Sequence, residues 1–345
     1  MVLYEETAAS SPKSLETFEG IEVALRGHIL EHIGPELGKF FVKTASGSTA
    51  GRSRTIKSPI GDVKITEKQA QALMLKGHTQ LSPLLETCCL LLSANESYAH
   101  AAQDIEVLTG RSVSHSTQQR LVHRQELSFM DADCTVEELS VDGGKVRIRT
   151  PLAQPCDWRD YKAIRLHEHT IGASFQANEV LIEWSNQQHL AEPLMCLGDG
   201  HDGIWNVIGE IGQDEHRVEI LDWYHLMENL AKVDCSEDLL DEVKELLWEG
   251  RVRTAIAKIE TCSDGHANAF VAYLRKHQHR IVNYEYYQWE GISIGSGAIE
   301  SGVKQIAARV KLTGAQWKAE NVPQVLRHRC AYLNGEFSTR ATCFT

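Results

Sequence analysis

The chain has 345 residues, of which 42% are hydrophobic and 24% charged, and this composition suits one large folded core with a smaller domain. Its formal net charge of −12 argues against nucleic-acid binding over the whole surface, because phosphates attract Lys and Arg. The charge is uneven: residues 210–249 contain thirteen acidic and three basic residues, whereas residues 301–345 contain two acidic and seven basic ones. We therefore expect a polyanion to bind near the carboxyl-terminal segment.

The amino terminus lacks the features of a signal peptide. Glu5 and Glu6 stand where such a peptide carries positive charge, and no long apolar segment follows them. The most apolar run, Leu84–Leu92, is shorter than a membrane-spanning helix and includes Glu86, so it predicts a buried helix. We expect a cytoplasmic protein.

The cysteine pattern predicts free thiols. The chain has nine cysteines and no Cys-x-x-Cys pair. An odd number in a long chain without paired spacing is typical of reduced, mostly buried thiols, and it argues against a zinc ribbon.

The first part of the chain predicts helices and a linker. An amphipathic helix is expected over Leu15–Ile33, and the Gly-, Ser- and Thr-rich stretch Thr44–Ser58 predicts a linker. We therefore expect residues 1–60 to form an N-terminal helical and linker region.

Residues 61–132 predict a helical region that is a candidate for DNA binding through a helix-turn-helix. Ser97–Leu108, with Ser97 as its N-cap, and Ser114–Leu127 are separated by Gly110. This pair has the length and turn of a helix-turn-helix, and an ordinary helical hairpin is an equally good interpretation.

From residue 133 onward the pattern changes to strands. Alternating residues around Gly143-Gly144 predict a hairpin with its turn at those glycines, and Tyr161–His167 predicts a third antiparallel strand. The following segments predict helix, strand, helix, strand, helix. Three antiparallel strands followed by this alternation is the succession of the ribonuclease H-like fold, an α/β fold whose mixed sheet is flanked by helices. We predict it for residues 133–345, with an all-α insertion at about 234–288.

Three acidic residues stand where this fold would place a site. Asp142 and Asp199 are predicted near strand ends beside glycines, and Glu300 opens the last core helix on a stripe with Lys304 and Lys311. Two hard cations, Mg²⁺ or Mn²⁺, about 4 Å apart and held by such carboxylates would activate a nucleophile and stabilise a leaving oxygen at a phosphodiester. Singly, each acid is more typical of a turn or of a helix start. Their joint occurrence favours a metal site.

Asp202 is the main competitor of Asp199 as the second ligand. We expect it instead to cap a helix that begins at Gly203. Three tryptophans are candidates for stacking on unpaired bases, although a lone tryptophan is more often a core residue: Trp205, Trp289 and Trp317.

Several stretches, in order, resemble the ISKra-type insertion-sequence transposases of bacteria. The similarity covers about Glu137–Glu336 and implies a DDE transposase with Asp142, Asp199 and Glu300 as its acidic triad. Asp222-x-x-His225 resembles a motif that follows the second acid in several DDE families, where the histidine would position the scissile phosphate or balance charge. A capping Asp with a packed His is an equally good interpretation. The matching stretches are Ser140–Pro151, Trp158–Lys162, Cys196–Asn206, Ile220–Leu230, Gly295–Lys304, Leu312–Trp317 and Arg329–Gly335.

The resemblance implies double-stranded DNA as the partner, both the terminal repeats of the element and the target, and at least a homodimer to pair two ends. It also implies cleavage at the element ends followed by strand transfer. Two alternatives stay open: a catalytically idle DNA-binding protein derived from a transposase, and a ribonuclease H-like nuclease that does not join strands. The expected DNA contacts are Lys145, Lys304, Lys311, Arg309, Trp317, Arg120 and Arg124.

Overall fold

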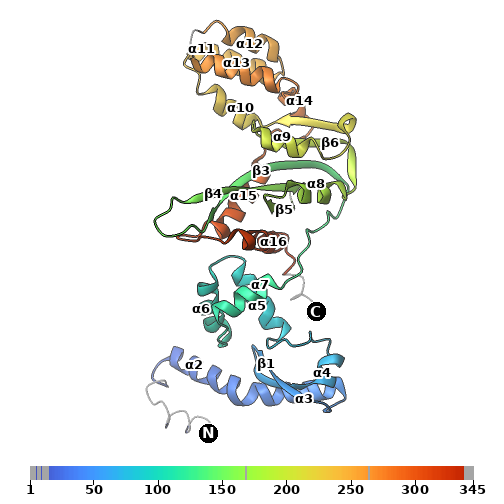
Figure 1. Cartoon of the computed structure of the whole chain (residues 1–345), viewed down its shortest axis with the longest axis vertical. Coiled ribbons are helices and arrows are strands. Elements are labelled where there is room, and N and C mark those ends of the chain that lie inside the picture. Colours follow the sequence, from blue (N-terminus) through green and yellow to red (C-terminus); the bar gives the residue numbers. More distant parts are fainter. Residues whose placement is uncertain (1–4, 6–8, 10–14, 168, 263–264, 338–345) are drawn as a thin grey trace. The chain divides into compact units, whose positions relative to one another are not determined.

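The computed structural model describes residues 5, 9, 15–167, 169–262 and 265–337 (Figure 1). These residues form two units, one comprising the chain up to Gln125 together with Phe337 and the other spanning Glu126–Glu336. The sequence suggests boundaries after residues 60 and 132 instead. Cys343 and most of Met1–Ser14 lie outside the described residues. Within the described ranges, no helix is both long enough and apolar enough to cross a membrane.

The first part of the amino-terminal unit combines helices with a β-hairpin. The linker expected over Thr44–Ser58 is wrong, because Ser53–Ser58 forms a strand in which Ile56 pairs with Val63. Both side chains are buried in a small core, an alternation that the surrounding Ser and Thr residues obscure. The elements are α2 (Phe18–His28), the π-helix η2 (Ile29–Ile33), α3 (Gly34–Ser46), β1 (Ser53–Ser58), β2 (Gly61–Thr66) and α4 (Glu67–Ala72).

The second part of this unit is a group of three helices that pack on one another. Each begins at a serine whose hydroxyl accepts a hydrogen bond from a backbone N–H three residues later, which satisfies a free donor of the first turn. Gly110, in the left-handed conformation with φ 66°, ends the second helix. The two helices expected on either side of Gly110 are therefore present. The group consists of α5 (Pro83–Ser93), α6 (Tyr98–Thr109) and α7 (His115–His123).

The second unit is built on a five-stranded mixed sheet with the strand order β5-β4-β3-β6-β7. The first three strands in chain order are antiparallel, and β6 and β7 continue the sheet in parallel beside β3. The predicted α/β class with a mixed sheet flanked by helices is confirmed. The strands are β3 (Val136–Ile148), β4 (Asp157–Leu166), β5 (Thr170–Phe175), β6 (Leu190–Gly198) and β7 (Arg217–Leu221).

The hairpin expected at Gly143-Gly144 is wrong, because both glycines lie inside the long strand β3. Their partners on β4 are Lys162 and Tyr161. A Cβ at Gly144 would collide with the ring of Tyr161, and a Cβ at Gly143 would lie 3.0 Å from Lys162 Nζ. The glycines therefore allow close approach across the strands rather than a turn.

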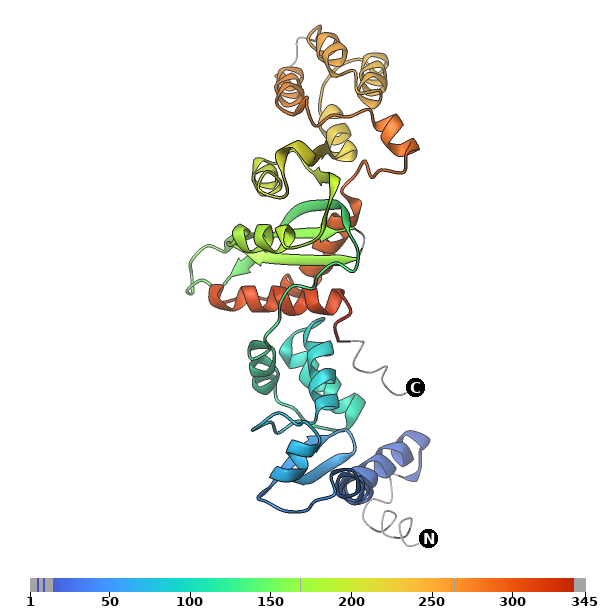
Figure 2. The ribbon, with the colours of Figure 1, turned by 90° about the vertical axis from the view of Figure 1, so that its right-hand side faces the viewer.

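Helices cover both faces of the sheet (Figure 2). Two of them, α8 and α9, contact one face, while α15 and α16 contact the other. Each face has its own buried apolar cluster, as the two-residue period of a strand requires. The helical segments of this layer are α8 (Asn178–Asn186), α9 (Asp202–Ile208), η3 (Asp214–His216), α15 (Gly297–Val310), η4 (Ala319–Asn321) and α16 (Val322–Leu333).

A helical insertion separates β7 from α15, as the sequence predicts. The chain leaves the sheet through α10 and forms four further helices before it returns. Their apolar residues continue the cluster on the α8 and α9 face, so the insertion is packed against the sheet region. The helices are α10 (Trp223–Leu230), α11 (Glu237–Trp248), α12 (Val252–Ile259), α13 (Gly265–His277) and α14 (Tyr284–Trp289).

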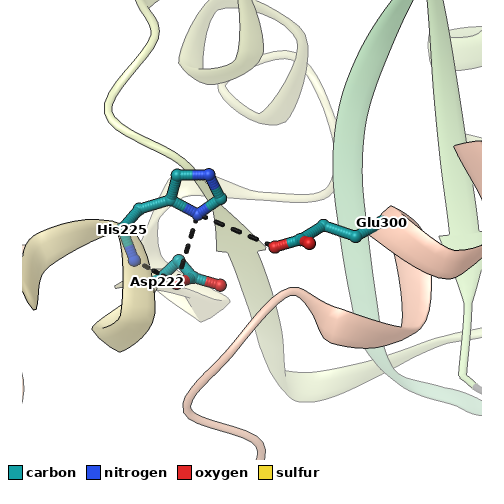
Figure 3. Close-up of side chains that lie close together, drawn as sticks. All are labelled: Asp222, His225 and Glu300. Carbon is teal, nitrogen blue, oxygen red and sulfur yellow. Dashed lines mark hydrogen bonds and ion pairs between the residues drawn. The ribbon is translucent and has the colours of Figure 1, made fainter. Parts of the chain in front are cut away.

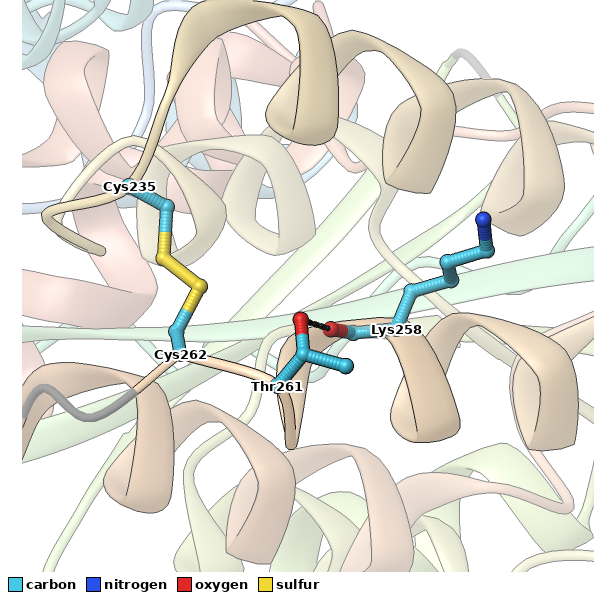
Figure 4. Close-up of a disulfide and its surroundings, with 4 residues drawn as sticks. All are labelled: Cys235, Lys258, Thr261 and Cys262. Atoms are coloured by element: carbon cyan, nitrogen blue, oxygen red, sulfur yellow. Dashed lines mark hydrogen bonds between the residues drawn. A yellow bond between two sulfur atoms is a disulfide. The ribbon is translucent and has the colours of Figure 1, made fainter.

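One pair of cysteines corrects the expectation of free thiols throughout. Cys235 and Cys262 form a disulfide in the insertion (Figure 4). Cys235 precedes α11 and Cys262 follows α12, and because these two helices pack on each other, the far ends of the segment meet. The described thiols that stay free are Cys88, Cys89, Cys134, Cys156, Cys196 and Cys330, of which Cys134 and Cys156 are exposed.

Candidate functional site

Asp142 lies on the face of the sheet that α15 covers. Val146 and Ile148 on the same strand belong to the apolar cluster beneath α15 and α16. Asp142 precedes them by an even number of residues and pairs with Ala163 of the same cluster, so its side chain points to that face. Its Oδ1 accepts a hydrogen bond from the N–H of Gly143 at 2.6 Å.

Asp199 lies beside Asp142 at the end of the neighbouring parallel strand. Gly198 pairs with Val141, so the next residues on the two strands are Asp199 and Asp142. The Oδ1 of Asp199 accepts a hydrogen bond from the N–H of His201 at 2.8 Å, in the turn that leads to α9. The strand register thus brings the first two predicted acids together.

Glu300 comes to the site from the first turn of α15, which contacts β3. Its Oε1 lies 3.5 Å from Ser296 Oγ and 3.8 Å from His225 Nδ1, and its Oε2 lies 3.5 Å from Lys304 Nζ. All three contacts are at or beyond the long limit of a hydrogen bond. The carboxylate, 31% exposed, is therefore weakly held.

The three predicted acids act on one another electrostatically. Burial raises the pKa of Asp142, and the negative charges of Asp199 and Glu300 raise it further. The hydrogen bond from Gly143 and the positive charge of His225 oppose this shift. A carboxyl group whose ionisation is disfavoured by two other carboxylates is a place where a cation would be stabilised.

A group of potential metal ligands in the described part of the chain is composed differently from the predicted triad. Potential ligand atoms of Asp222, His225 and Glu300 lie within 4.8 Å of one another (Figure 3). Glu300 belongs to this group, whereas Asp142 and Asp199 do not. The structure therefore places Glu300 between the predicted triad and the Asp222–His225 pair.

Asp222 is fully buried and joins two segments of the chain. It caps α10, its Oδ1 accepting the N–H of His225 at 2.8 Å, which confirms the capping interpretation. Its Oδ2 accepts hydrogen bonds from the backbone N–H of Ser296 and, at 2.6 Å, from the Ser296 hydroxyl. Burial raises the pKa of Asp222, but the hydrogen bonds from His225 and Ser296 outweigh burial and bring the pKa down to about 2.

His225 is a cation in this arrangement. Its Nδ1 lies 3.3 Å from Asp222 Oδ1. The interaction with Asp222 raises the pKa of His225 to about 9 against the opposing effect of burial, and Glu300 adds to the rise. The imidazolium therefore offsets part of the negative charge of the carboxylates.

Neither a protein-family model nor a curated protein matches this chain. The chemistry of the site rests on its donors, which are carboxylate oxygens from the middle of β3, from the residue after β6 and from the first turn of α15. Such oxygens are the ligands that Mg²⁺ and Mn²⁺ prefer. The arrangement therefore suits divalent cations that act on a phosphate ester.

The cap role expected for Asp202 is wrong. The helix α9 begins at Asp202 and is capped by His201, whose Nδ1 accepts the N–H of Gly203 at 3.0 Å. Asp202 instead forms an ion pair with Lys276 of α13, and this hydrogen-bonded contact lowers its pKa. Asp202 thus connects α9 to the insertion.

Two residues near the acids carry no signal in the sequence for this position. Tyr273, from the insertion, packs so closely on Gly200 that a Cβ there would collide with its ring. Burial raises the pKa of Tyr273, and the charges of Asp199 and Asp222 raise it further. Lys162 places its Nζ beside Gly143 of β3. Only the strand register and the packing of α13 bring these side chains to the site.

The expected DNA contacts near α15 divide into exposed and buried residues. Lys145 and Lys304 have side chains that are 64% and 78% exposed, and Lys311 is exposed at the end of α15. Arg309 is 1% exposed, with its guanidinium carbon 4.9 Å from the centre of the Trp317 ring. Trp317 is fixed by a hydrogen bond from its Nε1 to the Val310 carbonyl at 2.9 Å. The burial of Arg309 does not fit the expected DNA contact, whereas Trp317 is half-buried and its expected contact stays a prediction.

The remaining candidates lie elsewhere. In the amino-terminal unit, Arg120 is exposed on α7, and Arg124 forms an ion pair with Glu86 at 3.1 Å. Trp205 is a core residue with 5% exposure, whereas Trp289 at the end of α14 is 80% exposed. Of these two tryptophans, only Trp289 is available for stacking.

Proposed function

We propose that this chain is a metal-dependent DNA transposase that cleaves element ends and joins them to target DNA, built on a ribonuclease H-like core. The succession of three antiparallel strands and two parallel strands with intervening helices supports that fold. The resemblance of residues 137–336 to ISKra-type transposases supports the activity. Double-stranded DNA is the substrate, and pairing of two ends requires at least a dimer.

The observation that carries this proposal is the strand register that makes Asp142 and Asp199 neighbours, together with Glu300 on α15, the helix that contacts β3. In the described residues, the ligand atoms of these three acids do not meet within 4.8 Å, so the proposal includes a movement of Glu300 toward the two aspartates. The shared electrostatic effect on the pKa of Asp142 supports their closeness. These side chains would hold Mg²⁺ or Mn²⁺, which would activate the attacking oxygen and stabilise the leaving oxygen of a phosphodiester.

The weak contacts of Glu300 suit a ligand that changes partners. Its carboxylate faces His225 and Lys304 across distances of 3.5 to 3.8 Å, so little is lost when it turns toward Asp142 and Asp199. While Glu300 lies next to His225, the positive charge of His225 balances part of the negative charge of Asp222 and Glu300. In this role His225 positions Glu300.

The test is metal-dependent nicking of supercoiled plasmid DNA carrying candidate element ends, in Mg²⁺ and Mn²⁺. Asp199→Asn and Glu300→Gln should each lower the cleavage rate by more than about 100-fold. Loss of a residue that only orients a metal ligand typically lowers activity by about 10- to 100-fold, and loss of the ligand itself should lower it further. The matched control is Asp202→Asn, which removes an acid three residues from Asp199 that pairs with Lys276. Full cleavage by Asp199→Asn, or an equal loss in the control, would overturn the proposal.

A second assay separates transposition from hydrolysis. Pre-cut ends with free 3′-hydroxyl groups should be joined to target plasmid by the unmodified chain. Cleavage without joining would identify a nuclease, and DNA binding with neither activity would identify an idle descendant of a transposase.

A further inference from the structure

Tyr273 of the helical insertion brings a phenol hydroxyl to the turn that follows β6. A Cβ at Gly200 would collide with the ring of Tyr273 and with its hydroxyl oxygen. Gly200 directly follows Asp199 in the chain, so the hydroxyl lies beside the backbone that carries a predicted metal ligand. The glycine therefore makes room for this hydroxyl next to the candidate site.

Two further contacts of α13 hold Tyr273 in this place. Its ring packs on the fully buried His277, with 4.7 Å between the ring centroids. Lys276 forms an ion pair with Asp202, the first residue of α9. Because residues three apart on a helix share a face, Tyr273 and Lys276 both contact the segment between β6 and α9. The hydroxyl is thus preorganised rather than free to swing away.

The proton of this hydroxyl lacks an acceptor. The oxygen is buried, and no acceptor lies within hydrogen-bond distance of it in the described ranges of the chain. Burial and the charges of Asp199 and Asp222 raise the pKa of Tyr273, so the hydroxyl keeps its proton, while Asn229 lowers the pKa as a donor to the phenol oxygen would. Buried donors without an acceptor are uncommon in folded proteins. Such a donor indicates a partner that moves into reach.

Of the two carboxylates that act on the hydroxyl, one has an oxygen to offer. Asp222 is saturated, because its Oδ1 accepts the N–H of His225 and its Oδ2 accepts both the N–H and the hydroxyl of Ser296. Among the residues that the structure describes, Asp199 accepts one hydrogen bond, from the N–H of His201 to Oδ1. The Oδ2 of Asp199 is therefore the acceptor that the geometry favours.

We propose that Tyr273 is a positioning residue of the candidate metal site, whose hydroxyl donates a hydrogen bond to Asp199 Oδ2 when that carboxylate holds a divalent cation. A hydrogen bond to a ligating carboxylate fixes its orientation and thereby strengthens metal binding. The inference rests on the proposed function for one point, that Asp199 is a metal ligand. The helical insertion then contributes a group to a site whose ligands come from the sheet and from α15.

The experiment measures binding of Mn²⁺ alone to the whole chain by electron paramagnetic resonance, without DNA. Tyr273→Phe keeps the ring on Gly200 and removes only the hydroxyl, and it should weaken Mn²⁺ binding about tenfold. The matched control is Tyr287→Phe, which removes the hydroxyl of a half-buried tyrosine on α14 of the same insertion and should leave the affinity unchanged. Unchanged affinity in Tyr273→Phe, or an equal loss in the control, would overturn the proposal.

A double variant shows whether the hydroxyl acts through Asp199. Asp199→Asn should weaken Mn²⁺ binding more than Tyr273→Phe does. Adding Tyr273→Phe to Asp199→Asn should cause no further loss, because the hydroxyl then has no carboxylate to orient. A second tenfold loss in the double variant would contradict the proposal, since the hydroxyl would then act through another group.

The melting temperature separates positioning from a structural role. Tyr273→Phe should melt at the same temperature as the unmodified chain when no metal is added, because the hydroxyl donates no hydrogen bond that its loss would break. A large drop would identify a structural role instead. In the plasmid-nicking assay, the same variant should lower kcat about tenfold and leave the KM for DNA unchanged.

The same measurements distinguish failure of this inference from failure of the proposed function. If Asp199→Asn leaves Mn²⁺ binding unchanged, the proposed metal site is wrong, and the role of Tyr273 with it. If Asp199→Asn weakens Mn²⁺ binding and Tyr273→Phe does not, only the role of Tyr273 is wrong.

Discussion

The acidic site of the second unit and a groove of the amino-terminal unit that is lined by cationic side chains are opposite in charge and in construction. Two of the acids are aspartates with short side chains, Asp142 within β3 and Asp199 directly after β6, and the sheet register fixes their spacing. The cations that line this groove stand on long side chains, Arg54 and Lys57 on β1 and Arg120 and Arg124 in the last turn and at the C-cap of α7. A metal site needs close spacing of oxygens, whereas phosphate contacts tolerate flexible side chains.

Under the proposed function, this contrast would reconcile an acidic chain with a polyanionic substrate. The carboxylates that contribute to the net charge of −12 include those that the proposed divalent cations would neutralise. Net charge is therefore a poor guide to partners in a chain with two such regions.

Alanine substitutions at two glycines compare how tightly the two units are packed around them. Gly144→Ala should destabilise the second unit by about 3 kcal/mol, because the new Cβ collides with the buried ring of Tyr161. Gly27→Ala in α2 of the first unit meets no atom within 4 Å and should raise stability slightly, as alanine favours helix. Urea unfolding of both variants checks this, and a neutral Gly144→Ala would show that the sheet is less tightly packed than described.

The next effect concerns the buried Asp222. Asp222→Asn should lower the free energy of unfolding at pH 7 by about 2 kcal/mol, since the charged form is stabilised in the folded state, with a pKa of about 2. This contribution is fully present above the unfolded pKa of about 4 and is lost as the pH falls through about 2. Chemical denaturation between pH 7 and pH 2 measures it. If the difference in the free energy of unfolding between variant and unmodified chain became larger at low pH, the lowered pKa of Asp222 would be contradicted.

The smallest expected effect on stability is a gain rather than a loss. Asp142→Asn should raise the melting temperature without divalent cations, because the pKa of Asp142 is raised by burial and by neighbouring carboxylates. A raised carboxyl pKa means that stability falls as the pH rises through the interval above the unfolded pKa, and the amide removes that loss. Added Mg²⁺ should stabilise the unmodified chain more than the variant. Scanning calorimetry with and without Mg²⁺ tests both points. A lower melting temperature of the metal-free variant would show that the ionised Asp142 carboxylate does not destabilise the fold.

The sequence predicts an element well where the interactions that form it join residues close together in the chain. Ser97 marks a helix start because its hydroxyl needs only the backbone three residues on. Asp199 is likewise predicted just past the end of a strand, and it directly follows β6. Asp142 is predicted before a hairpin turn, and its place in the middle of β3 can be seen only once β4 and β6 are paired with β3.

Other features depend on partners far away in the chain. Gly143-Gly144 resembles a turn until Tyr161 and Lys162 are placed opposite, and a strand such as Ser53–Ser58 is hidden by its polar composition. The cap of α9 is His201, and Asp202, the first residue of that helix, pairs with Lys276 of the insertion, a partner several helices further along the chain. The position of Tyr273 follows from helix packing alone, for which spacing gives no signal.

Hydrogen bonds at the two ends of the helical insertion fix the points where it leaves and rejoins the sheet region. The N–H of Trp223 donates to the carbonyl of Ile294 at 2.9 Å, and Asp222 holds Ser296 immediately beyond. Between these points α13 reaches back to the turn after β6, because Tyr273 packs on Gly200 and Lys276 pairs with Asp202. A displacement of α13 would therefore be transmitted to the backbone beside Asp199, so the insertion is mechanically coupled to the candidate site.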